Sequence, residues 1–336
     1  GFVWVSFFWI PFSIFVMNIN DCLMSDCLIS ICIPAYKKPE YVVRAIQSVL
    51  KQSYKKVEIV ISDDSPNEDI KIAIQPYISD LDIKYYHNQP ALKSPMNWNN
   101  ALDKATGDYV MLLHQDDWLH HPNALEIYVA SFKSHPEAGF VFCKNTAIQP
   151  DGVHLNLQAI KSLLGNMVQK PHHILRANVI GPPSNVMLKR SIPIRYDENY
   201  IWLVDVDYYV QLLEAGNQYV YLDQHLVSIG LHEDQTTVFC RNNEDVIVKE
   251  NIHFAYKLGN KAFSDILIYD YYWRLLRNYH IRSEEDLFKM GVQQNQLLPV
   301  ITHQLNWEKR CPIGLLKFGP FSKILMTLNY LFKPVS

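Results

Sequence analysis

The sequence predicts an α/β protein with a doubly wound, mostly parallel sheet, flanking helices and a C-terminal helical extension. Three observations lead to this fold class. Short apolar runs alternate with segments of helical spacing between residues 28 and 143. Acidic clusters follow two of these apolar runs directly, as is typical of the carboxyl edge of a parallel sheet. From about residue 237 onward, only helical spacing continues.

The first part of the sheet is predicted from three strand–helix units. The strands are continuous apolar runs, typical of strands buried on both faces, over 28–33, 57–61 and 83–86. The helices that follow them are predicted over 40–52, from about 67 to 77, and over 95–105. Ser65 or Asn67 is expected to cap the second helix, and Pro34 is expected to end the first strand.

A fourth buried strand is predicted over 109–113, and it ends abruptly at His114. Beyond it, helices are predicted over 123–134 and 205–215, and strands over 139–143, within 181–189 and over 219–222. Further helices are predicted over 244–260, 264–280 and 284–298. The apolar tail over 314–334 is expected to pack back onto the core as a helix, with interfacial membrane binding as the alternative.

The pattern divides the chain into three segments. They are a lead-in over 1–24, an α/β domain over 25–236 and a helical extension over 237–336. The lead-in is almost entirely apolar. It is either a membrane-associating segment or a stretch that does not belong to the working protein, and the sequence leaves both interpretations open.

Composition excludes several classes of protein. A chain of 336 residues that is 49% hydrophobic can bury one sizeable core. A formal charge of −3, without a stripe of Lys and Arg, gives no sign of a nucleic-acid partner. The six cysteines form no C-x-x-C pair, so a reducing cytoplasmic location with thiols in the core is expected.

Acidic pairs follow two of the predicted strands, at the point where each strand ends. Asp63 and Asp64 follow the second strand, and Asp116 and Asp117 follow the fourth. Taken singly, each pair is equally well explained as a polar turn that caps the next helix. Together they place carboxylates on one rim of a sheet, which is unfavourable without a cationic ligand. The sequence therefore predicts a divalent cation that bridges these acids to a phosphate.

Residues 28–235 resemble the nucleotide-sugar glycosyltransferases of family 2, which have the GT-A fold. The matching segments occur in the family's order and lie at 31–36, 45–53, 58–65, 97–101 and 105–117. Asp205, Asp207 and His232 continue the series. The resemblance implies an enzyme that transfers a sugar in a single displacement, with inversion at the anomeric carbon.

The resemblance implies a donor site built around the two acidic pairs. Tyr36 would offer its ring to the base, and Asp63 would accept a hydrogen bond from the base. Asp64 would either support this loop or serve as a turn residue. The nucleotide-binding residues would be Pro34, Ala35, Tyr36, Asp63, Asp64 and Asp116. Mn²⁺ or Mg²⁺ on the diphosphate would be held by Asp116, Asp117 and His232.

The resemblance also implies a general base at the start of the helix over 205–215. Asp205 is the candidate for taking the proton of the acceptor hydroxyl, and Asp207 is the alternative. Either residue is equally suited to capping that helix. The residues expected to contact the acceptor or the donor sugar are His114, Pro183, Ser184 and Asp207.

Three positions depart from the family's pattern. His114 stands where Asp is frequent, Val204 replaces a Glu, and Gly230 replaces an Arg. A neutral His still binds a metal or a ribose, but the change at Gly230 removes an expected cation. His172 and His173 are expected to be surface loop residues, because no third ligand has an evident spacing.

The expected function is metal-dependent transfer of a sugar from a nucleotide-sugar, UDP-linked, to a glycan or lipid-linked acceptor in surface polysaccharide biosynthesis. The departures motivate an alternative, a catalytically silent nucleotide-binding scaffold of a glycan-assembly complex. A nucleotidyltransferase is disfavoured, because the turn at 34–39 lacks the Gly-rich phosphate loop. Peripheral association with the cytoplasmic face of a membrane and a homodimer are left open, and no motif names the donor sugar.

Overall fold

The computed structural model describes residues 27–152, 154–157, 164–165 and 167–333. The predicted lead-in over 1–24 therefore lies outside the described residues. The strands are β1 (Ile29–Ala35), β2 (Val57–Asp63), β3 (Asp82–His87), β4 (Tyr109–Leu112), β5 (Trp118–Leu119), β6 (Ala138–Ile148), β7 (His154–Leu157), β8 (Val186–Lys189) and β9 (Gln218–Gly230). The α-helices are α1 (Pro39–Leu50), α2 (Asp69–Ile74), α3 (Met96–Lys104), α4 (Ala124–Ser134), α6 (Val204–Glu214), α7 (Thr236–Arg241), α8 (Glu244–Ala262), α9 (Ile266–Asn278), α10 (Glu284–Lys289), α11 (Pro299–Glu308), α12 (Ile313–Lys317) and α13 (Gly319–Leu331).

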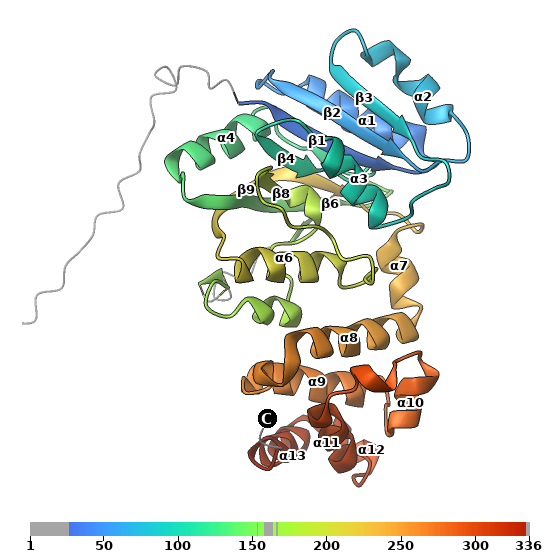
Figure 1. The fold of residues 1–336 in the computed structure, drawn as a ribbon, viewed down its shortest axis with the longest axis vertical. Coiled ribbons are helices and arrows are strands. Elements are labelled where there is room, and N and C mark those ends of the chain that lie inside the picture. Colours follow the sequence, from blue (N-terminus) through green and yellow to red (C-terminus); the bar gives the residue numbers. More distant parts are fainter. Residues whose placement is uncertain (1–26, 153, 158–163, 166, 334–336) are drawn as a thin grey trace, which may run out of the picture.

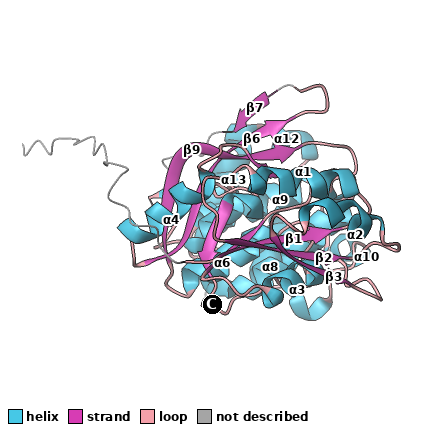
Figure 2. Ribbon diagram, turned by 90° about the horizontal axis from the view of Figure 1, so that it is seen from above, coloured by secondary structure: helices cyan, strands magenta, loops and turns pink. Residues whose placement is uncertain are grey.

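The strands of the described chain form one sheet in the order β3-β2-β1-β4-β8-β6-β9-β5, and β7 pairs with β6 at the outer edge (Figure 2). Strands β3, β2, β1 and β4 are parallel, β8 runs antiparallel to β4 and β6, and β9 is parallel to β6. The predicted class of a doubly wound sheet with a helical extension is confirmed. Because β1, β2 and β4 are parallel neighbours, their carboxyl ends share one edge of the sheet.

Side chains of alternate residues in β1 enter two different cores. Ile31 and Ile33 pack in the core that contains residues of α1 and α4. Cys32 packs on the opposite face with residues of α3 and α6. Both faces of the sheet are therefore covered, which explains why its central strands are continuously apolar.

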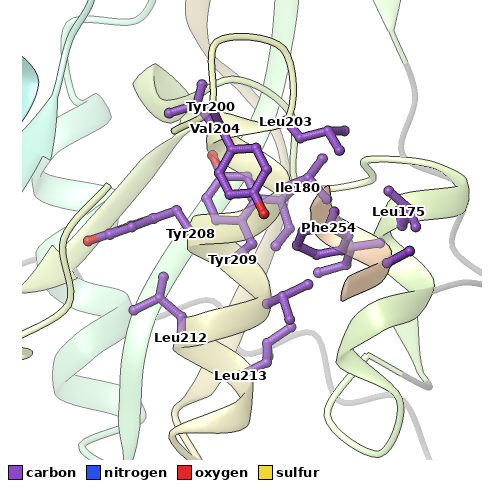
Figure 3. Packing of buried hydrophobic residues seen from close by; sticks show 14 of the residues in the cluster. Leu175, Ile180, Tyr200, Leu203, Val204, Tyr208, Tyr209, Leu212, Leu213 and Phe254 are labelled. Carbon is purple, nitrogen blue, oxygen red and sulfur yellow. The ribbon is translucent and has the colours of Figure 1, made fainter. Parts of the chain in front are cut away.

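Helix α6 joins the sheet to the helical extension. Figure 3 shows Tyr208, Tyr209 and Leu213 of this helix among buried side chains that include Phe254 of α8. In Figure 1, α6 lies beneath the sheet, and α8, α9 and α11–α13 follow toward the other end of the molecule. One hydrophobic core runs from Cys32 through α6 to Met326 of α13. The predicted boundary at 236/237 marks where the strands end, but the core continues across it.

Polar contacts from α8 fix the segment that leads into α6. The carboxylate of Glu250 accepts hydrogen bonds from the backbone N–H groups of Ile201, Trp202 and Leu203, at 2.8, 2.8 and 2.9 Å. Lys257 forms an ion pair with Asp207 at 2.6 Å. Residues of the helical extension therefore hold the beginning of α6 in position.

Several predicted boundaries were wrong. Pro34 does not end β1, because it pairs in register with Ser62 of β2 and the strand continues to Ala35. Neither Ser65 nor Asn67 caps α2, whose N-cap residue is Glu68 without a side-chain hydrogen bond. The predicted helix over 284–298 is a short α10 followed by a turn, and α11 begins only at Pro299. No helix in the described part of the chain is both long and apolar enough to cross a bilayer.

The side chain of Glu308 on α11 is a buried acid that should weaken the fold at high pH. It is fully buried, and neither carboxylate oxygen has a hydrogen-bond partner among the described residues. Burial raises the pKa of Glu308 to about 8, although Arg282 and Arg277 oppose this shift. The pKa in the unfolded chain is about 4.3, so the free energy of unfolding should fall as pH rises from about 4.3 to about 8.

We expect Glu308→Gln to raise the melting temperature near pH 8 by at least about 2–4 °C, because glutamine carries no charge to bury. Near pH 4 the two proteins should melt at similar temperatures, since Glu308 is then protonated. Differential scanning calorimetry at both pH values measures this difference. An equal shift at both pH values would show that the charge of Glu308 is not the cause.

Candidate active site

The turn between β4 and β5 brings Asp116 against a residue that follows β9. The Oδ2 atom of Asp116 lies 2.9 Å from Nε2 of His232 and 3.5 Å from Nε2 of Gln235. Strand β5 pairs with β9, and this pairing draws the two distant segments together. Burial opposes ionisation of Asp116, but the hydrogen bond to His232 holds its pKa below the ordinary value. Asp116 is therefore a carboxylate at neutral pH.

His114 is a partly buried imidazole beside the acidic pair. Its Nε2 atom is buried and has no hydrogen-bond partner among the described residues. Its ring lies 4.7 Å from the ring of Trp98, centroid to centroid. Burial lowers the pKa of His114, so the ring is neutral and keeps a lone pair for a ligand. Ligand atoms of His114, Asp116 and Asp117 all lie within 4.8 Å of one another.

Asp117 is held by hydrogen bonds from two other segments. Its Oδ2 accepts a hydrogen bond from the Ser184 hydroxyl at 2.5 Å, and its Oδ1 accepts one from the Gly230 N–H at 3.2 Å. The residue is 2% exposed, and burial together with the charge of Asp116 raises its pKa well above the ordinary value. Asp117 is almost fully enclosed, whereas the Asp116 side chain is 18% exposed, so Asp116 is the more available carboxylate.

Pro183 and Ser184, expected to contact the acceptor, are buried in the 3₁₀-helix Pro183–Asn185. The Ser184 hydroxyl also accepts a hydrogen bond from the His114 N–H at 3.0 Å. Ser184 thus connects β4 to the segment before β8. In this arrangement Pro183 and Ser184 lie beneath the turn over 114–117, which we call the acidic turn, and do not line an open cleft.

A divalent cation fits the groups present. Asp116 supplies a charged oxygen, and His114 supplies a buried nitrogen that has no other partner among the described residues. The Nδ1 atom of His232 is likewise buried without such a partner. Carboxylate and imidazole groups are both ligands of divalent cations, so the donor set fits such a cation without selecting one metal.

Arg44 of α1 provides a cation at this turn. One guanidinium nitrogen donates to the Asp116 carbonyl oxygen at 2.6 Å, and the group lies 4.0 Å from the ring centre of Trp118. A Cβ atom at Gly230 would lie 2.4 Å from the same carbonyl oxygen and 3.1 Å from Arg44. Arg44 therefore occupies the space that the arginine expected at position 230 would need.

Gly230→Ala should disturb this arrangement, because the added methyl group cannot avoid the Asp116 carbonyl. We expect a loss of stability of about 1–3 kcal/mol and a weakening of Mn²⁺ affinity by about tenfold. Thermal unfolding and isothermal titration calorimetry with Mn²⁺ measure the two effects. Gly314→Ala is the matched control, since a Cβ there meets nothing within 4 Å. If Gly230→Ala kept the wild-type Mn²⁺ affinity, the contact at the Asp116 carbonyl would not contribute to cation binding.

Tyr36 lies at the open end of β1, as the nucleotide prediction requires. Its side chain is 49% exposed, with the Lys37 ammonium 4.8 Å from the ring centre. The amide of Gln115 accepts a hydrogen bond from the Tyr36 N–H at 2.8 Å and donates one to the Tyr36 carbonyl at 3.1 Å. Gln115 thereby ties this strand end to the acidic turn. Pro34 and Ala35 are buried within β1 beneath Tyr36.

The first acidic pair is more enclosed than predicted. Asp63 is fully buried, and its oxygens accept hydrogen bonds from the Ser65 N–H at 2.8 Å and the Tyr85 hydroxyl at 2.7 Å. Asp64 accepts from the N–H groups of Leu92 and Lys93 at 3.0 and 2.7 Å. Asp64 therefore organises the loop before α3, and Asp63 reaches a base only if the Tyr85 or Ser65 bond is exchanged.

Asp205 and Asp207 have different surroundings at the start of α6. Asp205 accepts hydrogen bonds from the Asn178 side chain at 2.7 Å and the Val206 N–H at 2.8 Å. Burial raises the pKa of Asp205 to about 6, although these hydrogen bonds oppose the shift. Asp207 is fully buried and paired with Lys257, so it points into the contact with α8. Of the two, only Asp205 has the character of a proton acceptor.

Sequence reasoning missed several residues that organise the site. They are Arg44, Trp98, Gln115, Asn178 and Gln235. Their roles depend on contacts between segments that are far apart in the chain, and local sequence patterns do not predict such contacts. Gln115 is the exception, because it stands in the polar cluster that the sequence predicts after the strand over 109–113.

The parallel strands, the acidic turn after β4 and the partly buried Asp205 at the start of α6 define an enzyme domain of the GT-A fold class. Residues 30–193 match the family model described as Glycosyl transferase family 2. Over this stretch the chain is similar to that family of glycosyltransferases.

Relatives support the assignment over parts of the chain. A GalNAc(5)-diNAcBac-PP-undecaprenol beta-1,3-glucosyltransferase of Campylobacter jejuni is 39% identical over 88 residues, which are 26% of this chain and 28% of that protein. The matches to the first curated relatives span 28% of those proteins' length.

Solved structures resemble nearly the whole chain. TarS 1–349 of S. aureus in complex with UDP-GlcNAc has a TM-score of 0.56 and 16% identity, covering 90% of this chain and 89% of that one. The mannosyltransferase PcManGT from Pyrobaculum calidifontis, in complex with GDP-Man and Mn²⁺, has a TM-score of 0.52 and 13% identity, covering 91% and 87%. At these identities the likeness shows the fold.

Proposed function

We propose that this protein transfers a sugar from a UDP-linked donor to a hydroxyl of a glycan or lipid-linked acceptor in polysaccharide biosynthesis, with inversion and with a divalent cation. The observation that carries the proposal is the convergence of Asp116, His114 and His232 at the sheet edge, with Asp205 as a separate, partly buried acid. The match to the family model supports the reaction class. The nucleotide-sugars in the TarS and PcManGT complexes support the donor class, and the undecaprenol-linked substrate in the relative's name supports the acceptor class.

The donor would lie along the carboxyl ends of β1 and β4. The exposed ring of Tyr36 provides a surface on which a base can stack, and Lys37 places a positive charge beside it. The Gln115 amide keeps Tyr36 at a fixed position relative to Asp116. These contacts orient the diphosphate toward the acidic turn.

The cation would be held by Asp116 with His232 and His114. When bound, such an ion neutralises charge on the departing diphosphate. Asp117 and Arg44 keep the turn in place, through the side chain of Asp117 and the carbonyl of Asp116 respectively.

Asp205 would act on the acceptor. The acceptor oxygen forms a bond to the anomeric carbon as the bond from that carbon to the phosphate oxygen breaks, and the hydroxyl proton passes to the Asp205 carboxylate. Asn178 and the Val206 N–H each bond a different oxygen of Asp205, which fixes the orientation of its carboxylate. A pKa of about 6 leaves this group mostly ionised at neutral pH and still basic enough to take a proton.

The proposal is tested by incubating the purified chain with a panel of nucleotide-sugars, with and without Mn²⁺, and measuring release of nucleoside diphosphate. Thermal shift with UDP and GDP under the same conditions measures binding alone. We expect UDP to stabilise the protein only with Mn²⁺, and one UDP-sugar to be consumed. Binding without turnover for every donor and acceptor pool tried would instead support the catalytically silent scaffold.

A further inference from the structure

We propose that α12 and α13 form a surface that docks on a bilayer containing anionic phospholipid. This inference concerns the end of the molecule far from the sheet, so it goes beyond the proposed reaction and does not depend on it (Figure 1). It rests on an outward apolar face, a basic cavity beside that face, and the distribution of charge along the segment.

Helix α13 packs onto the protein through Met326, which enters the hydrophobic core, and through two polar residues. Ser322 accepts a hydrogen bond from the Trp273 indole at 3.0 Å, and Asn329 accepts one from the Tyr269 hydroxyl at 2.5 Å. Both Ser322 and Asn329 are buried.

The outward face of α13 carries a row of exposed apolar residues. Ile324, Leu328 and Leu331 follow one another at intervals of four and three residues, so they share one face of the helix. Their side chains are 63%, 43% and 68% exposed. Scattered apolar residues on a surface need no explanation, but a stripe along a whole helix does.

The neighbouring segment extends this apolar surface. The exposed large apolar residues of α12 and the two ends of α13 are Ile313, Leu315, Phe318 and Phe332. Figure 1 places α12 and α13 together at the end of the molecule opposite the sheet. These apolar side chains therefore lie far from the proposed donor site at the carboxyl ends of β1 and β4.

Basic residues surround this apolar surface. Residues 309–333 contain Lys309, Arg310, Lys317, Lys323 and Lys333, and no Asp or Glu. An open cavity of about 630 Å³ is lined by Arg282, Lys309, Arg310 and Lys317, together with His280 and Ile313. Lys323 is ion-paired with Asp270 at 2.9 Å, so the positive charge is concentrated at the cavity. A lipid phosphate is a complementary ligand for such a cavity.

Charge favours a bilayer over a second copy of this chain. A twofold dimer through α12 and α13 would bring the same patch of each copy together, with basic residues facing basic residues. An anionic bilayer neutralises that charge while its acyl region receives Ile324, Leu328 and Leu331. Apolar burial together with basic residues is the combination that holds interfacial helices on membranes.

The test is co-sedimentation of the full chain with vesicles of phosphatidylcholine alone or with about one third phosphatidylglycerol. We expect binding only to the anionic vesicles, with a decrease at high salt. The variant Leu328→Asp should lower the partition coefficient by at least about tenfold. The double variant Arg310→Ala/Lys317→Ala should lower it by about tenfold or more, since each surface charge contributes about fivefold.

Matched controls separate docking from loss of the fold. Ile72→Asp alters an apolar side chain of α2 that is 67% exposed and should leave vesicle binding unchanged. All variants should keep the wild-type melting temperature and the wild-type response to UDP and Mn²⁺. Equal binding of wild type and Leu328→Asp to anionic vesicles would overturn the proposal. So would a wild-type dimer, seen by sedimentation velocity, that Leu328→Asp converts to a monomer without any vesicle binding by either protein.

Discussion

Replacing Asp116 with asparagine is expected to lower Mn²⁺-dependent donor turnover by about 10³-fold or more. Asparagine keeps the shape of the side chain next to His232 but removes the charge that a divalent cation requires. A loss of about 4 kcal/mol of charge stabilisation in the transition state corresponds to this factor. Release of nucleoside diphosphate measures turnover, and calorimetric titration with Mn²⁺ measures loss of the cation.

Asp234→Asn provides the matched control for Asp116→Asn. Asp234 is an exposed acid two residues beyond His232, where it pairs with Lys38 at 3.2 Å. Its replacement should leave turnover within about twofold, because exposed ion pairs contribute little. If Asp116→Asn kept wild-type turnover and Mn²⁺ affinity, the assignment of the cation to this turn would be wrong.

Replacing Asp205 with asparagine is expected to lower kcat by about 10²–10⁴-fold and to leave the affinity for donor nearly unchanged. The carboxylate takes the acceptor proton only when ionised. Since burial raises its pKa to about 6, kcat/KM of the wild-type protein should rise with pH up to about 6 and then level off. This rise should be absent from the residual activity of the variant. The pH dependence of acceptor glycosylation measures both effects.

Asp207→Asn distinguishes a chemical role from a structural one on the same helix. It breaks the ion pair with Lys257 and should lower the melting temperature while kcat stays within about threefold. Asp205→Asn should not lower the melting temperature near pH 8, because it removes a charge whose burial is unfavourable. If Asp207→Asn were inactive and Asp205→Asn active, the general base would be Asp207 and Asp205 would have the structural role.

The sequence predicts the order of strands and helices in the first half of the chain, because both signals are local. The apolar runs at 57–61 and 109–113 predict buried strands, and the acids after them are predicted to lie at one edge of a parallel sheet. The structure contains both strands in one sheet. Strand β5 was missed because it has only two residues, Trp118 and Leu119, and pairing with β9 alone defines it.

The site is less predictable, because its contacts join residues far apart in the chain. Nothing local to Gly230 indicates that Arg44 fills the space beside it. The acidic pair Asp116 and Asp117 looks symmetrical in sequence, but the hydrogen bonds from Ser184 and Gly230 distinguish the two carboxylates. Only the packing of the 3₁₀-helix and β9 against the turn decides which acid is available.

The contacts of Glu250 and Lys257 with the start of α6 have a consequence for how the protein is made. The segment that carries Asp205 is synthesised before α8, whose side chains bind the backbone at Ile201–Leu203 and the carboxylate of Asp207. During translation the sheet can therefore form first, while the proposed base acquires its final position only after α8 has left the ribosome.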